Sequence, residues 1–141
     1  ANPGTVEQHR FRDYRAAGIN RLSLGIQSFE AEKLKILGRI HNGLEAQQAV
    51  ITAQQVGFDN INLDLMFGLP QQSIQQGLAD LEQAIALKPQ HISWYQLTLE
   101  PNTYFHRFPP PLAQDETIWH FQQQGQQLLQ DFDFNQYEIS A

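Results

Sequence analysis

Three short segments of the sequence alternate apolar and polar residues, and each is separated from the next by a stretch long enough to form a helix. The segments are Arg21–Gln27, Ile61–Phe67 and Ile92–Leu99. A period of two is typical of β-strands, and helix-length crossovers, nearly always right-handed, join parallel strands. The sequence therefore predicts an α/β fold. We favour a partial (β/α) TIM-like barrel with parallel strands over a doubly wound sheet.

Capping signals place helices between the strands. In a capping pair, a residue with a short polar side chain is followed three positions later by Glu or Gln. The pairs are Thr5 with Gln8, Asn42 with Glu45, and Ser73 with Gln76. A short helix is expected around Leu34, and a last helix from Asp115 is expected to bury an apolar stripe that includes Phe121 and Phe132.

Each predicted strand also has a polar face. We assign to these faces Arg21, Ser23, Gly25 and Gln27, then Asn60, Asn62, Asp64 and Gly68, and finally Trp94, Gln96, Thr98 and Glu100, with Tyr95 on the apolar side. Strands covered by helices on both faces, or facing a filled barrel, would be apolar throughout. The simplest explanation is a lumen that holds a polar ligand. Hydration of an incomplete barrel is the alternative.

The ligand site of a (β/α) barrel lies at the carboxyl ends of its strands. Gln27, Asp64 and Thr98 are predicted to lie there. For Asp64 alone, a structural hydrogen bond is an alternative to ligand contact.

Composition excludes several classes of function. The chain has no cysteine, which removes disulfides, thiol nucleophiles and thiolate ligands, and its net charge of −6 disfavours nucleic acid as a partner. Its five histidines lack the spacing of a metal site. No motif pairs a nucleophile with a base, and no apolar run approaches a membrane span. We therefore predict neither catalytic nor metal-binding residues in this chain.

Taken in order, six motifs carry a family resemblance. They are Asn2–Thr5, Asn20–Phe29, Leu37-Gly38-Arg39-x-His41, Asp64–Pro70, Tyr95–Pro101 and Gln136–Ser140. Their order and spacing resemble the radical S-adenosylmethionine (SAM) family of oxygen-independent coproporphyrinogen III oxidase-like proteins. The segments are closer to the haem-chaperone branch of that family than to the oxidases.

The resemblance implies a partial barrel that cradles a [4Fe-4S] cluster and SAM. Gln27 and Asp64 match positions that contact SAM around its ribose and adenosine. Arg39 matches a residue that pairs with the SAM carboxylate, a role that suits the planar guanidinium fork. Thr98 matches a position at a strand end that lines the adenine site.

The family's cysteine loop has no counterpart in this sequence. We therefore expect residues 1–141 to be a fragment of a single radical SAM partial-barrel domain, without its N-terminal cluster-binding part and its C-terminal part. Such a piece would not hold the cluster, which would belong to the parent protein together with SAM. Its uncovered barrel edge predicts self-association or marginal stability.

Three functions are compatible with the sequence. The first is a cytoplasmic haem chaperone that binds haem or porphyrinogen and passes haem to acceptor proteins, without nucleic acid as a partner. The second is a true oxidase that decarboxylates coproporphyrinogen III by radical chemistry. The third is a barrel domain that binds a small molecule and performs no redox chemistry. Product formation separates the first two, and assembly of a cluster in the parent protein separates both from the third.

Overall fold

Three parallel strands form one sheet with helices in the connections. The computed structural model describes residues 3–4, 8–38, 41–96, 115–132 and 134. Within these residues the elements are α2 (Phe11–Ala16), β1 (Arg21–Gln27), α3 (Ala31–Ile36), α4 (Gly43–Gln55), β2 (Asn60–Phe67), α5 (Ile74–Ala86), β3 (His91–Gln96) and α7 (Asp115–Asp131). The order in the sheet is β1-β2-β3, which confirms the predicted α/β fold with parallel strands.

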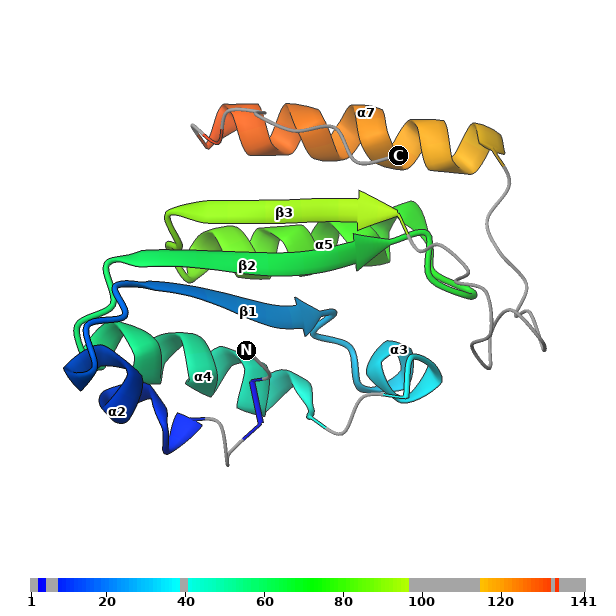
Figure 1. Cartoon of the computed structure of the whole chain (residues 1–141). Coiled ribbons are helices and arrows are strands. Elements are labelled where there is room, and N and C mark those ends of the chain that lie inside the picture. Colours follow the sequence, from blue (N-terminus) through cyan, green and yellow to red (C-terminus); the bar gives the residue numbers. More distant parts are fainter. Residues whose placement is uncertain (1–2, 5–7, 39–40, 97–114, 133, 135–141) are drawn as a thin grey trace.

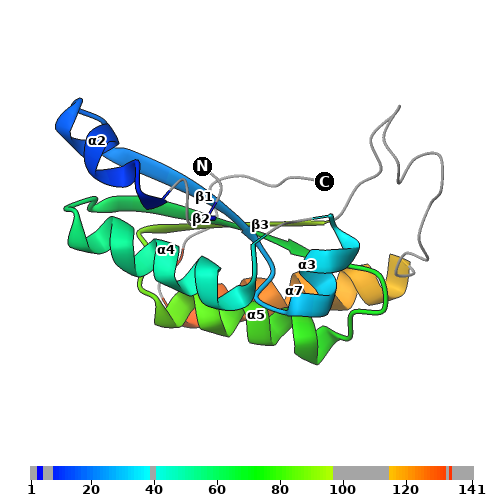
Figure 2. The same ribbon diagram turned by 90° about the horizontal axis from the view of Figure 1, so that it is seen from below.

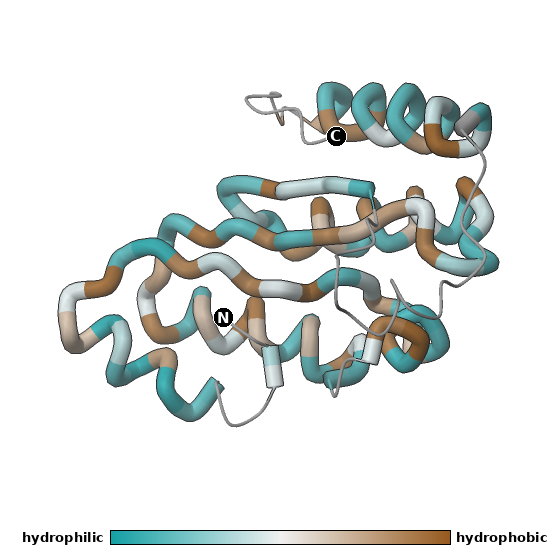
Figure 3. The backbone as a smooth tube through the Cα atoms, turned by 45° about the vertical axis from the view of Figure 1, so that its right-hand side comes forward, coloured by the Kyte–Doolittle hydropathy of each residue, from teal (hydrophilic) through white to brown (hydrophobic). Residues whose placement is uncertain are grey.

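The helices α4, α5 and α7 all lie on one face of the sheet (Figures 1 and 2). β1 and β2 alternate in hydropathy along their length (Figure 3). Their apolar side chains, among them Leu24, Leu63 and Leu65, are fully buried against helix residues such as Ala49 and Leu81. The opposite face is not covered by any helix among the described residues. This one-sided layering is that of a (β/α) barrel wall with its interior face open.

The third strand presents the opposite faces from those that the sequence suggested. Trp94 is the register partner of Leu65, and Tyr95 is the partner of Met66, so Trp94 lies on the apolar face and Tyr95 on the polar face. The indole of Trp94 packs on Phe67 with a centroid separation of 4.3 Å. Gln96 shares the apolar side, as the partner of Phe67. Our assignment was wrong because Trp and Tyr each combine an apolar body with a polar group, so alternation alone does not orient them.

The predicted helix starts are confirmed where the structure describes them. The amide of Asn42 accepts a hydrogen bond from the Glu45 backbone N–H, with N···O 2.8 Å. Ser73 and Gln76 form a complete capping box, with hydrogen bonds of 3.1 and 2.9 Å. Thr5 lies outside the described residues. These caps satisfy backbone N–H groups that have no partner within their helices.

The last helix packs on α5 and β3 through small residues and one buried ring. Phe121 is fully buried and stacks on Phe67 at 5.7 Å between ring centroids. A Cβ atom at Gly77 of α5 would lie 2.5 Å from the Phe121 ring. Phe132 is 56% exposed, so its predicted burial was wrong. It follows the last residue of α7, where the helical periodicity that placed it on the buried stripe has ended.

No helix in the described part of the chain combines the length and the apolar character needed to cross a membrane.

A glycine substitution tests the packing of α7. In most helices, replacement of Gly by Ala stabilises by about 1 kcal/mol. Here a Cβ at residue 125 would overlap the indole of Trp94, so we expect Gly125→Ala to lower the free energy of unfolding by about 1–3 kcal/mol. Gln123→Ala, at an exposed position of the same helix, should change it by less than about 0.5 kcal/mol. Urea unfolding measures both, and a stabilised Gly125→Ala protein would contradict this packing.

Candidate functional site

A hydrogen-bonded network of polar side chains joins all three strands on the open face of the sheet. The amide nitrogen of Asn62 donates to Ser23 Oγ at 3.0 Å and to Asp64 Oδ1 at 2.9 Å. The amide oxygen of Asn62 accepts from Ser93 Oγ at 3.1 Å, and Ser23 Oγ donates to Asp64 Oδ2 at 3.3 Å. We call these four residues the polar network. It satisfies its members internally, so the open face is stable as a polar surface.

Asp64 is the acceptor at the centre of this surface. Each of its carboxylate oxygens already accepts one hydrogen bond within the network, which fixes the orientation of the group. A carboxylate has about four acceptor positions, so Asp64 retains capacity for the hydroxyl or amino groups of a ligand. Its register partner on β1 is Gly25, which adds no side chain to the face beside it. The geometry is thus compatible with both roles considered for Asp64, a structural hydrogen bond and a ligand contact.

Gln27 ends β1 in a tight turn with a positive φ. The backbone N–H of Ser28 donates to the carbonyl of Ile26 at 2.8 Å, which closes a three-residue turn around Gln27. The φ of Gln27 is 69°, and the pairing of β1 with β2 shifts register between Gly25 and Gln27. A γ-turn with positive φ is rare and strained, and β-bulges re-aim side chains and are over-represented next to active sites. Gln27 itself is 6% exposed.

The side chain of Gln27 is held by a tyrosine from the far strand. Tyr95 Oη donates to Gln27 Oε1 at 2.7 Å, across the intervening strand β2. Because the amide oxygen is the acceptor in this bond, the amide nitrogen is the donor that a ligand can use. Sequence reasoning missed Tyr95 because it placed this residue on the apolar face. The one signal for it was that Trp94 and Tyr95, as neighbours in a strand, must point to opposite sides.

A second buried cluster supports the loop that follows Gln27. Asp80 of α5 accepts hydrogen bonds from Ser28 Oγ at 2.6 Å and from the Phe29 backbone N–H at 3.0 Å. Burial raises the pKa of the Asp80 carboxyl to about 6, although these two hydrogen bonds favour the charged form and oppose the shift. Nearby, the ammonium of Lys33 donates to the carbonyl of Pro70 at 3.1 Å. The loops after β1 and β2 are therefore tied to each other and to α5.

Two of the four predicted site residues can be placed. Gln27 and Asp64 lie on the neighbouring strands β1 and β2, and both contribute to hydrogen bonds on the open face. Arg39 and Thr98 lie outside the described residues. A fixed carboxylate acceptor and a fixed amide donor fit the hydroxyl and amino groups of an adenosine-like ligand. The ligands of an iron–sulfur cluster are thiolates, and the 141 residues contain no cysteine.

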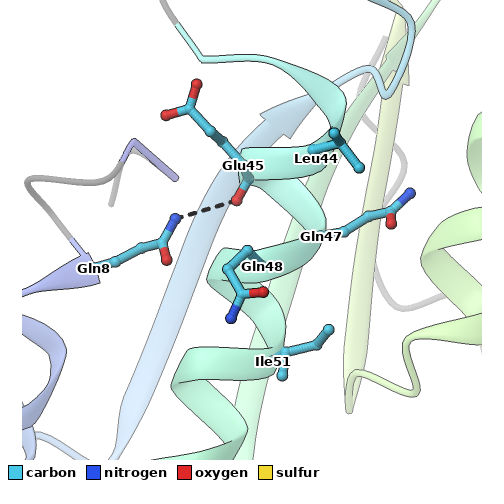
Figure 4. A pocket seen from close by; sticks show the side chains of 6 residues that line it. All are labelled: Gln8, Leu44, Glu45, Gln47, Gln48 and Ile51. Atoms are coloured by element: carbon cyan, nitrogen blue, oxygen red, sulfur yellow. Dashed lines mark hydrogen bonds between the residues drawn. The ribbon is translucent and has the colours of Figure 1, made fainter.

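A surface pocket of about 400 Å³ lies elsewhere (Figure 4). It is formed mainly by α4, with Leu44 and Ile51 as its apolar part, and Gln8 donates across it to the backbone carbonyl of Glu45 at 3.2 Å. Because α4 packs on the apolar face of the sheet, the pocket is on the opposite side from Asp64. Among the described residues no group of three or more His, Asp or Glu side chains could hold a metal ion there or elsewhere. We assign no chemistry to this pocket.

A parallel sheet with helices on one side and a polar network on the other defines a partial (β/α) barrel with a polar inner face. Comparison with known proteins identifies which barrel this is. The chain belongs to the radical SAM superfamily, whose family model matches residues 1–84.

Curated relatives align along the chain. Proteins named heme chaperone HemW from Escherichia coli (strain K12) and from Haemophilus influenzae are each 56% identical over 141 residues, which is 100% of this chain and 37% of theirs. A mitochondrial protein of Bos taurus, named radical S-adenosyl methionine domain-containing protein 1, is 35% identical over 99% of this chain and 33% of its own length. The chain thus spans about a third of the length of these relatives.

Solved structures share the fold. The coproporphyrinogen III oxidase HemN of Escherichia coli, a radical SAM enzyme, superposes with a TM-score of 0.83 at 24% identity, over 94% of this chain and 31% of that one. The archaeal Elp3 of Methanocaldococcus infernus superposes with a TM-score of 0.77 at 19% identity, over 89% of this chain and 31% of that one. At these identities the likeness establishes the fold, and it confirms the partial barrel.

The raised pKa of Asp80 predicts how stability depends on pH. An unfolded chain loses the Asp proton near pH 3.9, whereas the folded protein holds it to about pH 6. In that interval the folded state binds more protons, so the free energy of unfolding falls as pH rises, by about 3 kcal/mol in total. The side chain introduced by Asp80→Asn cannot ionise, so the free energy of unfolding of this variant should not show this fall with pH.

Urea unfolding of both proteins between about pH 4 and pH 7 measures the difference. We expect the stability of wild type relative to Asp80→Asn to decline across this range. Asp59→Asn, which removes an exposed carboxyl, is the control and should follow the wild-type curve. Parallel curves for wild type and Asp80→Asn would contradict the raised pKa.

Proposed function

We propose that this chain is the SAM-binding central part of a single partial-barrel domain in a haem chaperone of the radical SAM superfamily. The observation that carries the proposal is the pair of fixed polar groups at Gln27 and Asp64, on a wall whose fold is that of the superfamily. Support for the chaperone branch comes from the two relatives that are 56% identical along the whole chain and are named heme chaperones. A cytoplasmic location stays a prediction.

The residues of this chain would bind and orient SAM. SAM, together with a [4Fe-4S] cluster, supplies radical chemistry when both are bound. We propose that Asp64 accepts hydrogen bonds from the ribose or adenosine, and that Gln27, oriented by Tyr95, donates to the same part of the ligand. Arg39 would pair with the SAM carboxylate and Thr98 would line the adenine site, both by resemblance to the family.

The remaining partners are part of the same proposal. Without cysteine, this chain supplies no thiolate, so residues outside these 141 would hold the cluster. Haem or a porphyrinogen would be the cargo, and proteins that accept haem would be the recipients. Self-association through the uncovered barrel edge stays a prediction.

A true oxidase is the second candidate function. It is favoured by the superposition on HemN, but the identity of 24% establishes only the shared fold. A barrel domain that binds a small molecule without redox chemistry is the third, and its only support is that the polar network is compatible with many polar ligands.

One experiment separates these functions. The full-length natural protein, with its cluster reconstituted without oxygen, is given SAM, a reductant and coproporphyrinogen III, and in a parallel sample it is given haem. We expect stable haem binding, seen in the absorption spectrum, and no decarboxylated porphyrinogen. Formation of decarboxylated product together with 5′-deoxyadenosine would instead establish the oxidase. Failure to assemble any cluster would favour the third function.

Substitutions at the two described site residues test the SAM site directly. Gln27→Ala and Asp64→Asn each remove one hydrogen-bonding group, so each should weaken SAM binding by about 5- to 20-fold in equilibrium dialysis. Asp64→Asn also places an amide N–H₂ against one of the two donors, Asn62 or Ser23, so it should destabilise the fold by about 1 kcal/mol as well.

Matched controls are available on the same chain. Gln75→Ala replaces an exposed glutamine of α5, and Asp59→Asn replaces an exposed aspartate before β2. Both should bind SAM as wild type does. Wild-type affinity in Gln27→Ala and Asp64→Asn would remove these residues from the site and leave the polar network with a structural role.

A further inference from the structure

The turn at Gln27 needs external support. Among the described residues, the non-glycine residues with positive φ are Gln27, Gln71 and Lys88, and of these Gln27 alone is buried. A non-glycine residue in this conformation costs about 1–2 kcal/mol and persists where its surroundings hold it. Gln71 and Lys88 lie in exposed turns. Gln27 is instead followed by Ser28 and Phe29, which are also buried.

A histidine holds the backbone before the turn. His41 Nε2 lies 2.9 Å from the carbonyl oxygen of Ile26, the same oxygen that accepts from the Ser28 N–H. Because a carbonyl can only accept, Nε2 must carry the proton. His41 is 3% exposed and comes from the segment before α4. Its ring therefore fixes the position of the peptide group that precedes Gln27.

An aspartate holds the backbone after the turn. The Asp80 carboxylate accepts from Ser28 Oγ and from the Phe29 N–H, and Ser28 Oγ in turn accepts from the Glu30 N–H at 3.1 Å. Asp80 is 1% exposed and belongs to α5, a helix with a complete capping box. Hydrogen bonds to a carboxylate are stronger than those between neutral groups. The loop that leaves the turn is thus tied to a rigid helix.

We propose that His41 and Asp80 are positioning residues, which together hold Gln27 in its left-handed turn and so orient the side-chain amide that meets SAM. This inference rests on the proposed function, because it assumes that Gln27 contacts SAM. Neither residue needs to touch the ligand. Both hydrogen-bond to residues next to Gln27, while the Gln27 amide itself is held by Tyr95.

Single and combined substitutions of His41, Asp80 and Gln27 test these roles through the affinity for SAM. In the full-length natural protein, Asp80→Ala and His41→Ala should each weaken SAM binding by about tenfold, as loss of supporting contacts around a site does. Asp80→Asn retains an acceptor and His41→Gln retains a donor near Nε2, so each should weaken binding by less than about threefold. In a Gln27→Ala background, Asp80→Ala should change the affinity by less than about twofold, because its effect acts through Gln27.

A second measurement needs no ligand. In Asp80→Ala, the backbone amide of Phe29 loses its acceptor and should exchange with solvent at least about tenfold faster. The side-chain amide resonance of Gln27, assigned by its loss in Gln27→Ala, should shift in both Asp80→Ala and His41→Ala. Gln123→Ala, at an exposed position of α7, is the control and should change neither signal.

The outcomes separate the two proposals. If wild type binds no SAM, the proposed function fails, and the positioning role is then judged by exchange at Phe29 and the resonance of Gln27. Unchanged signals in Asp80→Ala and His41→Ala would overturn it. If SAM binds, equal losses from Asp80→Ala with and without Gln27 would also overturn it, because Asp80 would then act independently of Gln27.

Discussion

The parallel pairing of β2 with strands on both sides is the constraint on which the rest of this structure depends. β2 is the central strand, and its register with β1 and β3 brings residues from distant parts of the sequence to the same level of the sheet. Because side chains alternate along each strand, this register assigns every strand residue to one of two faces. A slip of one residue would turn Leu63 and Leu65 out of the core and Asp64 into it.

The two faces of the sheet are stabilised by different interactions. On the helix side, the burial of aliphatic and aromatic side chains provides most of the driving force for folding. On the open side, polar groups would be costly to bury unless they had partners. Ser23, Asn62, Asp64 and Ser93 meet that requirement by bonding to one another across three strands. The stability of this polar face therefore does not depend on a bound ligand.

The end of β1 has a strained backbone, which hydrogen bonds from other segments hold in place. The bulge and positive φ at Gln27 break the regular ladder at the carboxyl end of the strand. The groups that hold this turn come from the segment before α4 and from α5, which lie on the helix side of the sheet. An irregular turn is thus stabilised by hydrogen bonds from the regular core behind it.

The sequence by itself determined the α/β class, the parallel strands, the helix caps and the polar faces of the first two strands, because these follow from local periodicity and spacing. It also predicted Gln27 and Asp64 as site residues, and this stays a prediction. It did not determine the faces of Trp94 and Tyr95, since amphipathic aromatic residues suit either side. Nor did it indicate the hydrogen bonds that His41 and Asp80 make around the turn at Gln27. Only the tertiary structure decided these, because the contacts of Gln27 with Tyr95 and of Ser28 with Asp80 join residues 68 and 52 positions apart. No local pattern records a pairing at that distance, which arises only when the sheet and its helices pack together.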